Sequence, residues 1–356
     1  MSILQGRIDV HHHLIPPALS QTFTRLGIEK VAGAPLPAWS PRKSIDVMDG
    51  NGIQVALLSV SSPGTYFGDI AAARTLSRSC NEYVADVKSA NPGRFGHFAV
   101  LPMPFTQWAC EEAIFALDVL KAEGIVLMGS SDGRFLGDPS FDELMAELDR
   151  RQATVFLHPN LHASSEQLGL VAPGFFMEFL CDTTRAALNL IFTGTMERYP
   201  GIKWILAHAG GFLPYIAWRA SLANMIAELS GKMPQGVLTY LRRFYFDTAL
   251  SPADYSMAAL KQLVDPTHIL FGSDFPFAPA PVTTMQSQTL QQSSMWSDEV
   301  KYGINRGHAL SLFPQFRQAD ETVVASPVYR RESLGHYVRR TAALPLGMLA
   351  NHLRNR

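Results

Sequence analysis

Residues 154–160, "TVFLHPN", show the pattern that decides the fold: a short apolar run that ends in a polar side chain. A run that is nearly all apolar is typical of a strand buried on both faces of a parallel sheet. Because side chains alternate along a strand with a period of two, His158 shares a side with Phe156 and Thr154. The stretch therefore predicts a buried strand whose C-terminal end presents a histidine.

Similar runs recur along the chain, and segments of helical character separate them. One such segment, 138–151, has Asp138 as a cap and Pro139 in its first turn, followed by an apolar stripe. The alternation predicts an α/β fold, either a (β/α)8 TIM barrel or a doubly wound open sheet. The other seven runs are "RIDVHHH" at 7, "VALLSV" at 55, "RFGHFAVLP" at 94, "GIVLMGSS" at 124, "KWILAHAG" at 203, "FYFDTAL" at 244 and "HILFGSDFP" at 268.

Polar residues at the ends of these runs decide between the two folds. A closed barrel brings the C-terminal ends of all its strands to one mouth, whereas an open sheet would scatter them. We therefore expect a distorted (β/α)8 TIM barrel over residues 1–316, followed by a C-terminal extension, 317–356, that packs on the barrel or on a partner subunit. The polar residues are His11, His13, His158, His208 and Asp274.

The first run contains three consecutive histidines, residues 11–13. A purification tag is normally longer and lies in a featureless linker, whereas apolar residues flank this cluster on both sides. Strand alternation sends Asp9, His11 and His13 to one side and His12 to the other, so that one H-x-H pair can chelate an ion. Two histidines alone are weak evidence, because a buried histidine bonded to a backbone carbonyl is the alternative.

The amino-acid composition restricts the kinds of molecule that the protein is expected to bind. Of 356 residues, 47% are hydrophobic, and 30 Lys and Arg against 31 Asp and Glu give a net charge of −1. This balance gives no basic surface for nucleic acid or an anionic membrane, and no apolar run approaches the ~20 residues of a membrane span. Three cysteines without a C-x-x-C pattern, and no secretory segment, favour a reducing cytoplasm. We expect a cytoplasmic protein whose partner is a small molecule.

Three imidazoles and one carboxylate that converge from different strands suit a borderline divalent ion. Zn²⁺ is the expected metal, with Mn²⁺ and Fe²⁺ as alternatives, and no organic cofactor is expected. The site would leave room for water or substrate.

Four motifs include these polar residues: "DVHHH", "FLHPN", "LAHAGGFLPY" and "FGSDFPF". Together they resemble the decarboxylase branch of the amidohydrolase superfamily, which acts on hydroxybenzoates and carboxymuconate semialdehydes. The resemblance covers residues 7–316 and implies metal ligation by His11, His13, His158 and Asp274. It also implies that His208 is the catalytic histidine, that Asp274 is a candidate proton carrier, and that the protein is a homodimer or larger. Binuclear relatives carry a bridging lysine that "GIVLMGSSDG" lacks, so one ion per subunit is expected.

Arg219 lies eleven residues after His208. Its position matches an arginine that, in the muconate relative, reaches the neighbouring subunit's active site and holds a substrate carboxylate. The alternative is an ordinary arginine on a surface helix.

The resemblance implies a metal-dependent decarboxylase, without organic cofactor, of a small aromatic or muconate-type acid, with 6-methylsalicylate as one expected substrate. In one route water adds to the substrate with help from His208, and in the other an acid protonates the ring carbon. The alternative on the same fold is a hydrolase of an amide, a lactone or a vinylogous carbon–carbon bond, and a non-catalytic metal-binding barrel is the rival from another class. Release of CO₂ would separate the decarboxylase from these alternatives.

Overall fold

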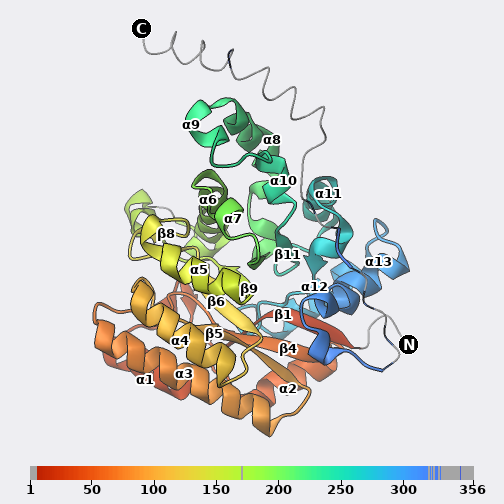
Figure 1. Ribbon diagram of the computed structural model, residues 1–356. Helices are drawn as coiled ribbons and strands as arrows, with labels where there is room; N and C mark the ends of the chain where they lie inside the picture. Colours follow the sequence, from red (N-terminus) through yellow and green to blue (C-terminus); the bar gives the residue numbers. More distant parts are fainter. Residues whose placement is uncertain are drawn as a thin grey trace.

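The computed structural model describes residues 6–169 and 171–319, together with 321, 323, 325–327, 329 and 345. Eight parallel strands form its main sheet, and their spatial order is also their order along the chain (Figure 1). Each of the eight predicted runs overlaps one of these strands, and two of the strands extend beyond their runs, β1 by one residue at its end and β4 by two residues at its start. They are β1 (Arg7–Leu14), β4 (Ile53–Val60), β5 (Phe95–Val100), β6 (Gly124–Met128), β9 (Thr154–His158), β10 (Lys203–Leu206), β11 (Tyr245–Asp247) and β12 (Ile269–Leu270).

The sheet closes between β1 and the segment that begins with β12. The backbone N–H of Val10 donates to the carbonyl of Phe271 at 3.0 Å, and that of Asp274 donates to the carbonyl of His11 at 2.8 Å. The expected (β/α)8 TIM barrel is therefore confirmed. It is distorted at this junction, because β12 has only 2 residues and its continuation follows β1 without regular pairing.

Helices cover the outside of the barrel, as Figure 1 shows for α1, α3 and α4 on one side and for α8, α9 and α10 at the opposite end. The helices are α1 (Pro17–Leu26), α2 (Pro41–Gly50), α3 (Ile70–Ala90), α4 (Thr106–Asp118), α5 (Asp142–Arg150), α6 (Glu178–Phe192), α7 (Thr195–Arg198), α8 (Leu213–Ser221), α9 (Ala227–Ser230), α10 (Val237–Leu241), α11 (Asp254–Leu263), α12 (Ala280–Gln292) and α13 (Asp298–Tyr302). Two short antiparallel pairs, β2 (Lys30–Val31) with β3 (Ala34–Pro35) and β7 (Ser130–Ser131) with β8 (Arg134–Phe135), lie outside the barrel sheet.

The helical segment after residue 138 forms as its sequence predicts. The Asp138 carboxylate accepts the backbone N–H of Ser140 at 2.9 Å, and Pro139 begins a short turn that leads into α5. The predicted apolar stripe faces the strands, because a strand buried on both faces needs an apolar helix face over it. Its members, Phe141, Leu144, Met145 and Leu148, are all buried.

Aromatic side chains fill the barrel beneath its mouth. Phe98 of β5 and Phe156 of β9 stack with ring centroids 5.6 Å apart, and Phe98 also contacts Phe313. Phe156 in turn packs against His11 of β1 at 4.8 Å. The predicted ligands thus lie above a dry, close-packed floor.

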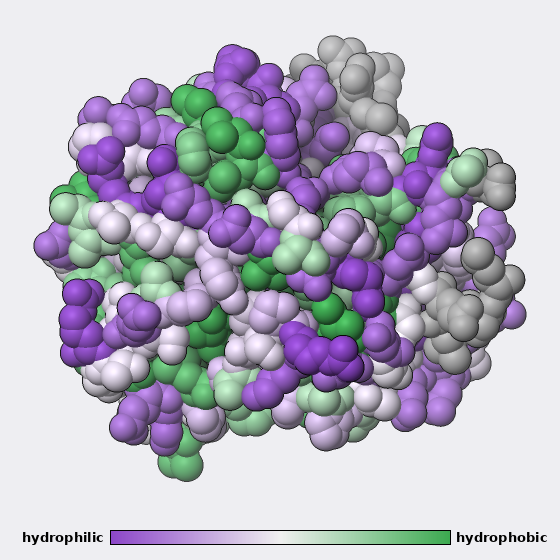
Figure 2. All heavy atoms as spheres, turned by 90° about the horizontal axis from the view of Figure 1, so that it is seen from below, coloured by the Kyte–Doolittle hydropathy of each residue, from purple (hydrophilic) through white to green (hydrophobic). Residues whose placement is uncertain are grey.

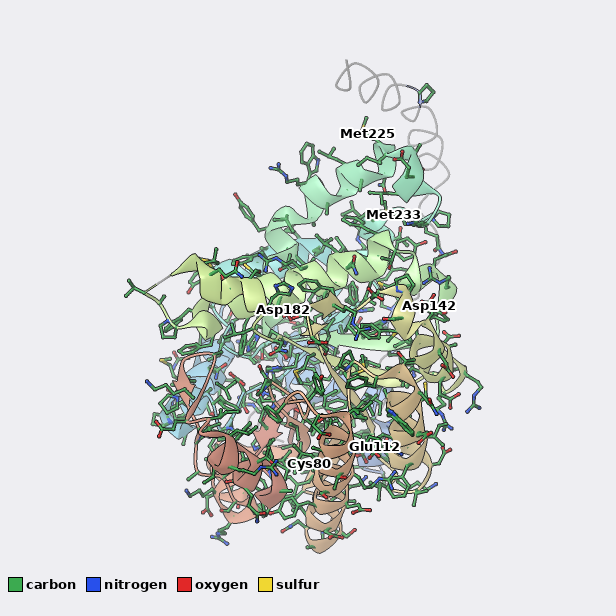
Figure 3. The ribbon with its side chains drawn as sticks, turned by 90° about the vertical axis from the view of Figure 1, so that its left-hand side faces the viewer. Cys80, Glu112, Asp142, Asp182, Met225 and Met233 are labelled. Atoms are coloured by element: carbon green, nitrogen blue, oxygen red, sulfur yellow. The ribbon has the colours of Figure 1, made fainter. Side chains whose placement is uncertain are left out.

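The outer helix faces mix residue types, and Figure 2 shows hydrophilic and hydrophobic residues interspersed over one face of the molecule. Figure 3 shows the layers from the side, with Cys80 of α3 and Glu112 of α4 in the lower part, Asp182 of α6 near the middle, and Met225 and Met233 in the upper part. None of the helices in the described ranges is both long and apolar enough to cross a membrane.

Most of the predicted C-terminal extension, 317–356, lies outside the described residues. Two of the described ones contact the barrel: the Glu321 carboxylate pairs with the buried Arg306, and the carbonyl of Tyr329 accepts from Arg243 Nε at 2.9 Å. The packing of the extension as a whole stays a prediction.

Candidate metal centre

Four predicted ligands converge at the barrel mouth. His11 and His13 come from β1, His158 is the last residue of β9, and Asp274 follows β12. One ligand atom from each lies within 4.8 Å of the others, and all four side chains are buried. His11 Nε2 is 3.0 Å from His13 Nε2, and Asp274 Oδ1 lies 3.2 and 3.3 Å from these two nitrogens. The strand ends therefore meet as a closed barrel requires.

Hydrogen bonds behind the three histidines fix which ring nitrogen faces the centre. His11 Nδ1 lies 2.7 Å from Asp247 Oδ2, His13 Nδ1 is 3.2 Å from the Ser59 carbonyl, and His158 Nδ1 is 2.8 Å from the Pro159 carbonyl. Carbonyl and carboxylate oxygens only accept, so each Nδ1 carries a proton and each Nε2 is the nitrogen that faces the centre, where it can bind an ion once it is unprotonated.

The donor set fits a divalent cation. Three lone pairs and a carboxylate oxygen that point at one another repel unless positive charge lies between them. Imidazole nitrogens held by acceptors on the far side, together with one carboxylate, are ligands that Zn²⁺, Mn²⁺ and Fe²⁺ accept. The structure thus brings together the residues that a metal ion would need, with no lysine on β6 to bridge a second ion.

One detail of β1 differs from strict alternation. The sequence places Asp9 on the side of His11 and His13, but its carboxylate lies 2.9 Å from His12 Nδ1 and accepts the Ser273 hydroxyl. The β1–β4 register shifts between Asp9 and His12, and such a bulge reverses the side that preceding residues face. That expectation for Asp9 was therefore wrong, whereas His11 and His13 do share a side.

His208 lies beside the four ligands. Its Nε2 is 3.8 Å from Asp274 Oδ2, and its ring centroid is 5.0 Å from that of His11. Its Nδ1 is buried without a hydrogen-bond partner among the described residues. Both His208 (φ 55°) and Asp274 (φ 61°) have left-handed backbones, which cost about 1–3 kcal/mol in a non-glycine residue and cluster at functional sites.

The cluster is strongly coupled electrostatically. Burial opposes protonation of His11, but the Asp247 and Asp274 carboxylates outweigh it and raise the pKa of His11 to about 10. Burial lowers the pKa of His13, and burial with the neighbouring histidines holds the pKa of His158 well below its usual value. Burial alone would raise the pKa of Asp274, but hydrogen bonds from the histidines hold it well below its ordinary value. Positive charge is thus favoured at the centre of the cluster.

Asp247, at the end of β11, is a supporting residue that the sequence reasoning missed. It is fully buried, and while Oδ2 holds His11, Oδ1 accepts the backbone N–H groups of His208 and Ala249 at 2.8 and 3.0 Å. It therefore orients one ligand and the backbone of the catalytic candidate together. The signal was present in "FYFDTAL", where an acid ends the seventh apolar run as His158 ends the fifth.

Arg219 lies apart from these residues, on the exposed face of α8. Among the described residues it has no hydrogen bond or ion pair. The neighbouring Tyr215 and Trp218 are 88% and 74% exposed, so this face of the helix is apolar around a free guanidinium.

Comparisons with known proteins show which proteins this chain is similar to. A protein named decarboxylase yanB from Aspergillus niger is 39% identical over 325 residues, covering 87% of this chain and 88% of the relative. The 6-methylsalicylic acid decarboxylase of Penicillium expansum is 34% identical over 317 residues, covering 88% and 97%. A crystal structure of a dihydroxybenzoic acid decarboxylase from Polaromonas, with bound manganese and the inhibitor 2-nitroresorcinol, shares the fold with a TM-score of 0.75 at 22% identity, covering 88% of this chain and 98% of that one.

The relatives confirm the resemblance read from the four motifs. Residues 8–314 match the family described as amidohydrolase, which is most of the chain. The chain belongs to the amidohydrolase family.

Proposed function

We propose that the chain is a metal-dependent decarboxylase, a carbon–carbon lyase, of small aromatic carboxylic acids of the hydroxybenzoate type, with 6-methylsalicylate as the first substrate to test. The observation that carries the proposal is the set of four ligand atoms within 4.8 Å at the barrel mouth, with His208 beside it. Two relatives that this chain matches over nearly its whole length are named decarboxylases, which supports the same reaction.

One divalent ion per subunit is the proposed cofactor, held by His11, His13, His158 and Asp274. Zinc remains the proposed metal on the donor set, while the manganese in the Polaromonas structure makes Mn²⁺ the first alternative. A bound cation would stabilise negative charge on the substrate carboxylate and an adjacent hydroxyl oxygen.

The side chains supply the proton chemistry. Asp274 directs Oδ1 towards the imidazoles of β1, and its Oδ2 lies 3.8 Å from His208 Nε2, so a proton can pass between these two atoms once they approach to hydrogen-bond distance. Loss of CO₂ leaves an electron pair at the ring carbon, and protonation of that carbon completes or precedes the step. We assign His208 as the general acid–base residue and Asp274 as a ligand that shares its proton.

Arg219 is proposed to bind a substrate carboxylate across a subunit boundary. Its free guanidinium lies in an exposed apolar face, where burial by a second subunit would bring it into a shared interface, and a planar guanidinium pairs bidentately with a carboxylate. The functional unit would then be at least a dimer. Mixing inactive Arg219→Ala and His208→Ala subunits should restore activity, because one site of a mixed dimer keeps both groups. A mixture that stays inactive although subunit exchange is confirmed would contradict the proposal that Arg219 acts in the neighbouring subunit's site.

The experiment for the function itself is a screen of hydroxybenzoates and carboxymuconates with metal-loaded protein, in which CO₂ release and water incorporation are both measured. We expect CO₂ from a hydroxybenzoate and none from protein stripped of metal. Water incorporation without CO₂ would make the chain a hydrolase instead. A cytoplasmic location, predicted from composition, remains to be tested by fractionation.

A further inference from the structure

A cavity of about 340 Å³ lies on the β4–β6 side of the barrel mouth. This volume is at the lower end of the roughly 300–1,000 Å³ found for small-molecule sites. Buried apolar side chains form much of its wall. The apolar members are Val100, Leu101, Met103, Val126 and Met128.

None of the four ligands is among the residues that line this cavity, but strand pairing joins two of its lining residues to the metal centre. Met128 is the register partner of His158, and Val126 is that of Phe156. Register partners on parallel strands face the same side, and His158 and Phe156 both point into the barrel. Met128 and Val126 therefore also point inward, one strand away from a ligand.

The charged side chains near the cavity determine which end of an aromatic acid substrate would face it. No lysine or arginine lines it, and Asp132 lies at its exposed rim, so a carboxylate is disfavoured there. The ligand cluster on the other side is where negative charge is stabilised. An aromatic acid would thus direct its carboxylate to the metal centre and the remainder of its ring towards β6.

The one amide of the cavity wall is already engaged. Asn160 Oδ1 accepts the hydroxyl of Ser62 at 2.7 Å and the backbone N–H of Leu161 at 2.9 Å, and its Nδ2 donates to the Ser130 carbonyl at 3.0 Å. Its backbone N–H donates to the buried Asp182. A substituent against β6 therefore meets mainly hydrocarbon.

We propose that Val126 and Met128 are specificity-determining residues that select an alkyl group, rather than a second hydroxyl group, on the ring of the aromatic acid. This inference rests on the proposed function and names the substrate class within it. The Val126 side chain cannot pair with a hydroxyl group and the Met128 sulfur is only a weak acceptor, so a hydroxyl group that loses its water on entering the cavity is poorly compensated. One methyl group in an apolar pocket changes kcat/KM by roughly 10–200-fold.

The test uses two acids that differ only at this group, 6-methylsalicylate and 2,6-dihydroxybenzoate. The dissociation constant of each is measured by calorimetry, and kcat/KM by CO₂ release. Wild-type protein should favour the methyl acid by at least 10-fold. The near-isosteric polar variants Val126→Thr and Met128→Gln should each lower that preference by 10-fold or more, at unchanged metal content and circular dichroism.

Val155→Thr is the matched control. Val155 is as buried as Val126 and lies on the adjacent strand β9, but it alternates with the inward-facing residues and so faces the helices. The preference of the Val155→Thr variant for 6-methylsalicylate over 2,6-dihydroxybenzoate should equal that of the wild-type protein. A preference unchanged in both cavity variants, or a wild-type protein that favours the dihydroxy acid, would overturn the inference. Failure to release CO₂ from either acid would instead count against the proposed function, while the binding ratio would still decide the inference.

Discussion

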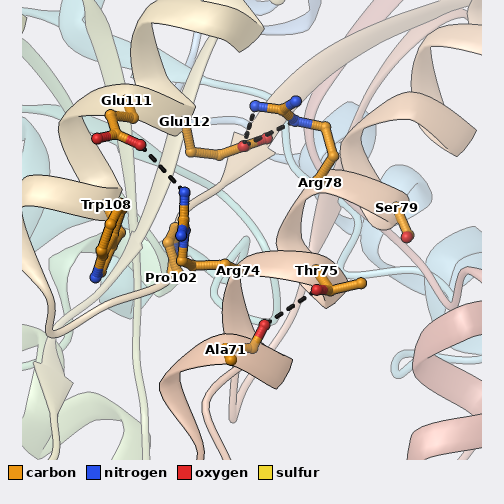
Figure 4. Close-up of a pocket in the computed structure, with 9 residues that line it drawn as sticks. All are labelled: Ala71, Arg74, Thr75, Arg78, Ser79, Pro102, Trp108, Glu111 and Glu112. Carbon is orange, nitrogen blue, oxygen red and sulfur yellow. Dashed lines mark hydrogen bonds and ion pairs between the residues drawn. The ribbon is translucent and has the colours of Figure 1, made fainter.

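The α3–α4 cleft and the barrel mouth both have charged side chains around a hollow. They differ in whether those side chains are already paired with one another. The cleft between α3 and α4, about 390 Å³ in volume, holds Arg74, Arg78, Glu111, Glu112 and a tryptophan (Figure 4). Arg78 Nη2 pairs with Glu112 at 2.9 Å, and Arg74 Nη2 pairs with Glu111 at 3.3 Å.

Each of the four charged side chains in that cleft is therefore already paired with an opposite charge in the same cleft. Arg74 also stacks on Trp108 at 3.5 Å, and the second oxygen of Glu112 accepts from Asn81 Nδ2 at 2.7 Å. At the barrel mouth, by contrast, outer hydrogen bonds hold the histidines so that their free lone pairs meet. The difference shows that a cluster of polar side chains is a candidate binding site when its ligand atoms are oriented but have no partner of opposite charge. A cluster whose charged groups are already paired with one another instead stabilises the packing of the helices.

The largest effect should come from removing a ligand. His158→Ala takes one nitrogen from the ligand set, so we expect loss of the tightly bound ion and turnover reduced to background, measured by elemental analysis and CO₂ release. His162→Ala is the matched control, since this half-buried histidine of the loop after β9 stacks on Phe135 of β8 and is not one of the four ligands. Full metal content in His158→Ala would contradict the assignment.

The next effect should come from His208→Ala. We expect the ion to stay bound and kcat to fall by about 10²–10⁴-fold, because general acid–base catalysis contributes on that order. A variant that turns over normally would move the proton chemistry elsewhere. A variant isolated without metal would recast His208 as a ligand.

Asp247→Asn should have an intermediate effect. An amide placed at Oδ2 would present N–H groups to His11 Nδ1, which needs an acceptor, so metal affinity should fall by about 10–100-fold. Affinity is measured by competition with a chelator. Asp265→Asn is the control, because that aspartate caps a turn before β12. Equal affinities in the two variants would mean that Asp247 does not orient the ligand.

The smallest effects should come from the α3–α4 cleft. Glu112→Ala removes the carboxylate that accepts from Arg78 and one of the two acceptors of the buried Asn81 Nδ2, so the free energy of unfolding should fall by about 1–3 kcal/mol. Arg74→Ala, in a largely exposed pair, should change it by about 0–1 kcal/mol. Denaturant unfolding measures both. Metal content and CO₂ release should stay at wild-type values, and a loss of either would show that this cleft is coupled to the site.

The strands and the ligand set were predictable because both depend on local pattern. A strand buried on both faces is an apolar run, and the rule that parallel strand ends converge places His158 and Asp274 with the histidines of β1. Contacts that depend on the stagger between strands were not predictable from the sequence. The bulge that turns Asp9 to His12, and the closure that brings Asp247 against His11, join residues whose relative height the sequence does not encode locally.

The cavity beside β6 could not be predicted for a related reason. Val126 and Met128 look like any core residues in "GIVLMGSS", and only the register with β9 shows that they line the space next to a ligand. The left-handed backbone of His208 is likewise set by the turn after β10. An apolar run predicts burial but not which buried residues border the site.

The central claim is that one ion at the barrel mouth makes this chain a decarboxylase. The most direct measurement titrates metal-free protein with Zn²⁺ or Mn²⁺ and follows bound ion and CO₂ release from 6-methylsalicylate in the same samples. CO₂ release should rise in proportion to bound ion and level off at one ion per chain. CO₂ release that does not depend on the ion, or that levels off only at two ions, would contradict the account.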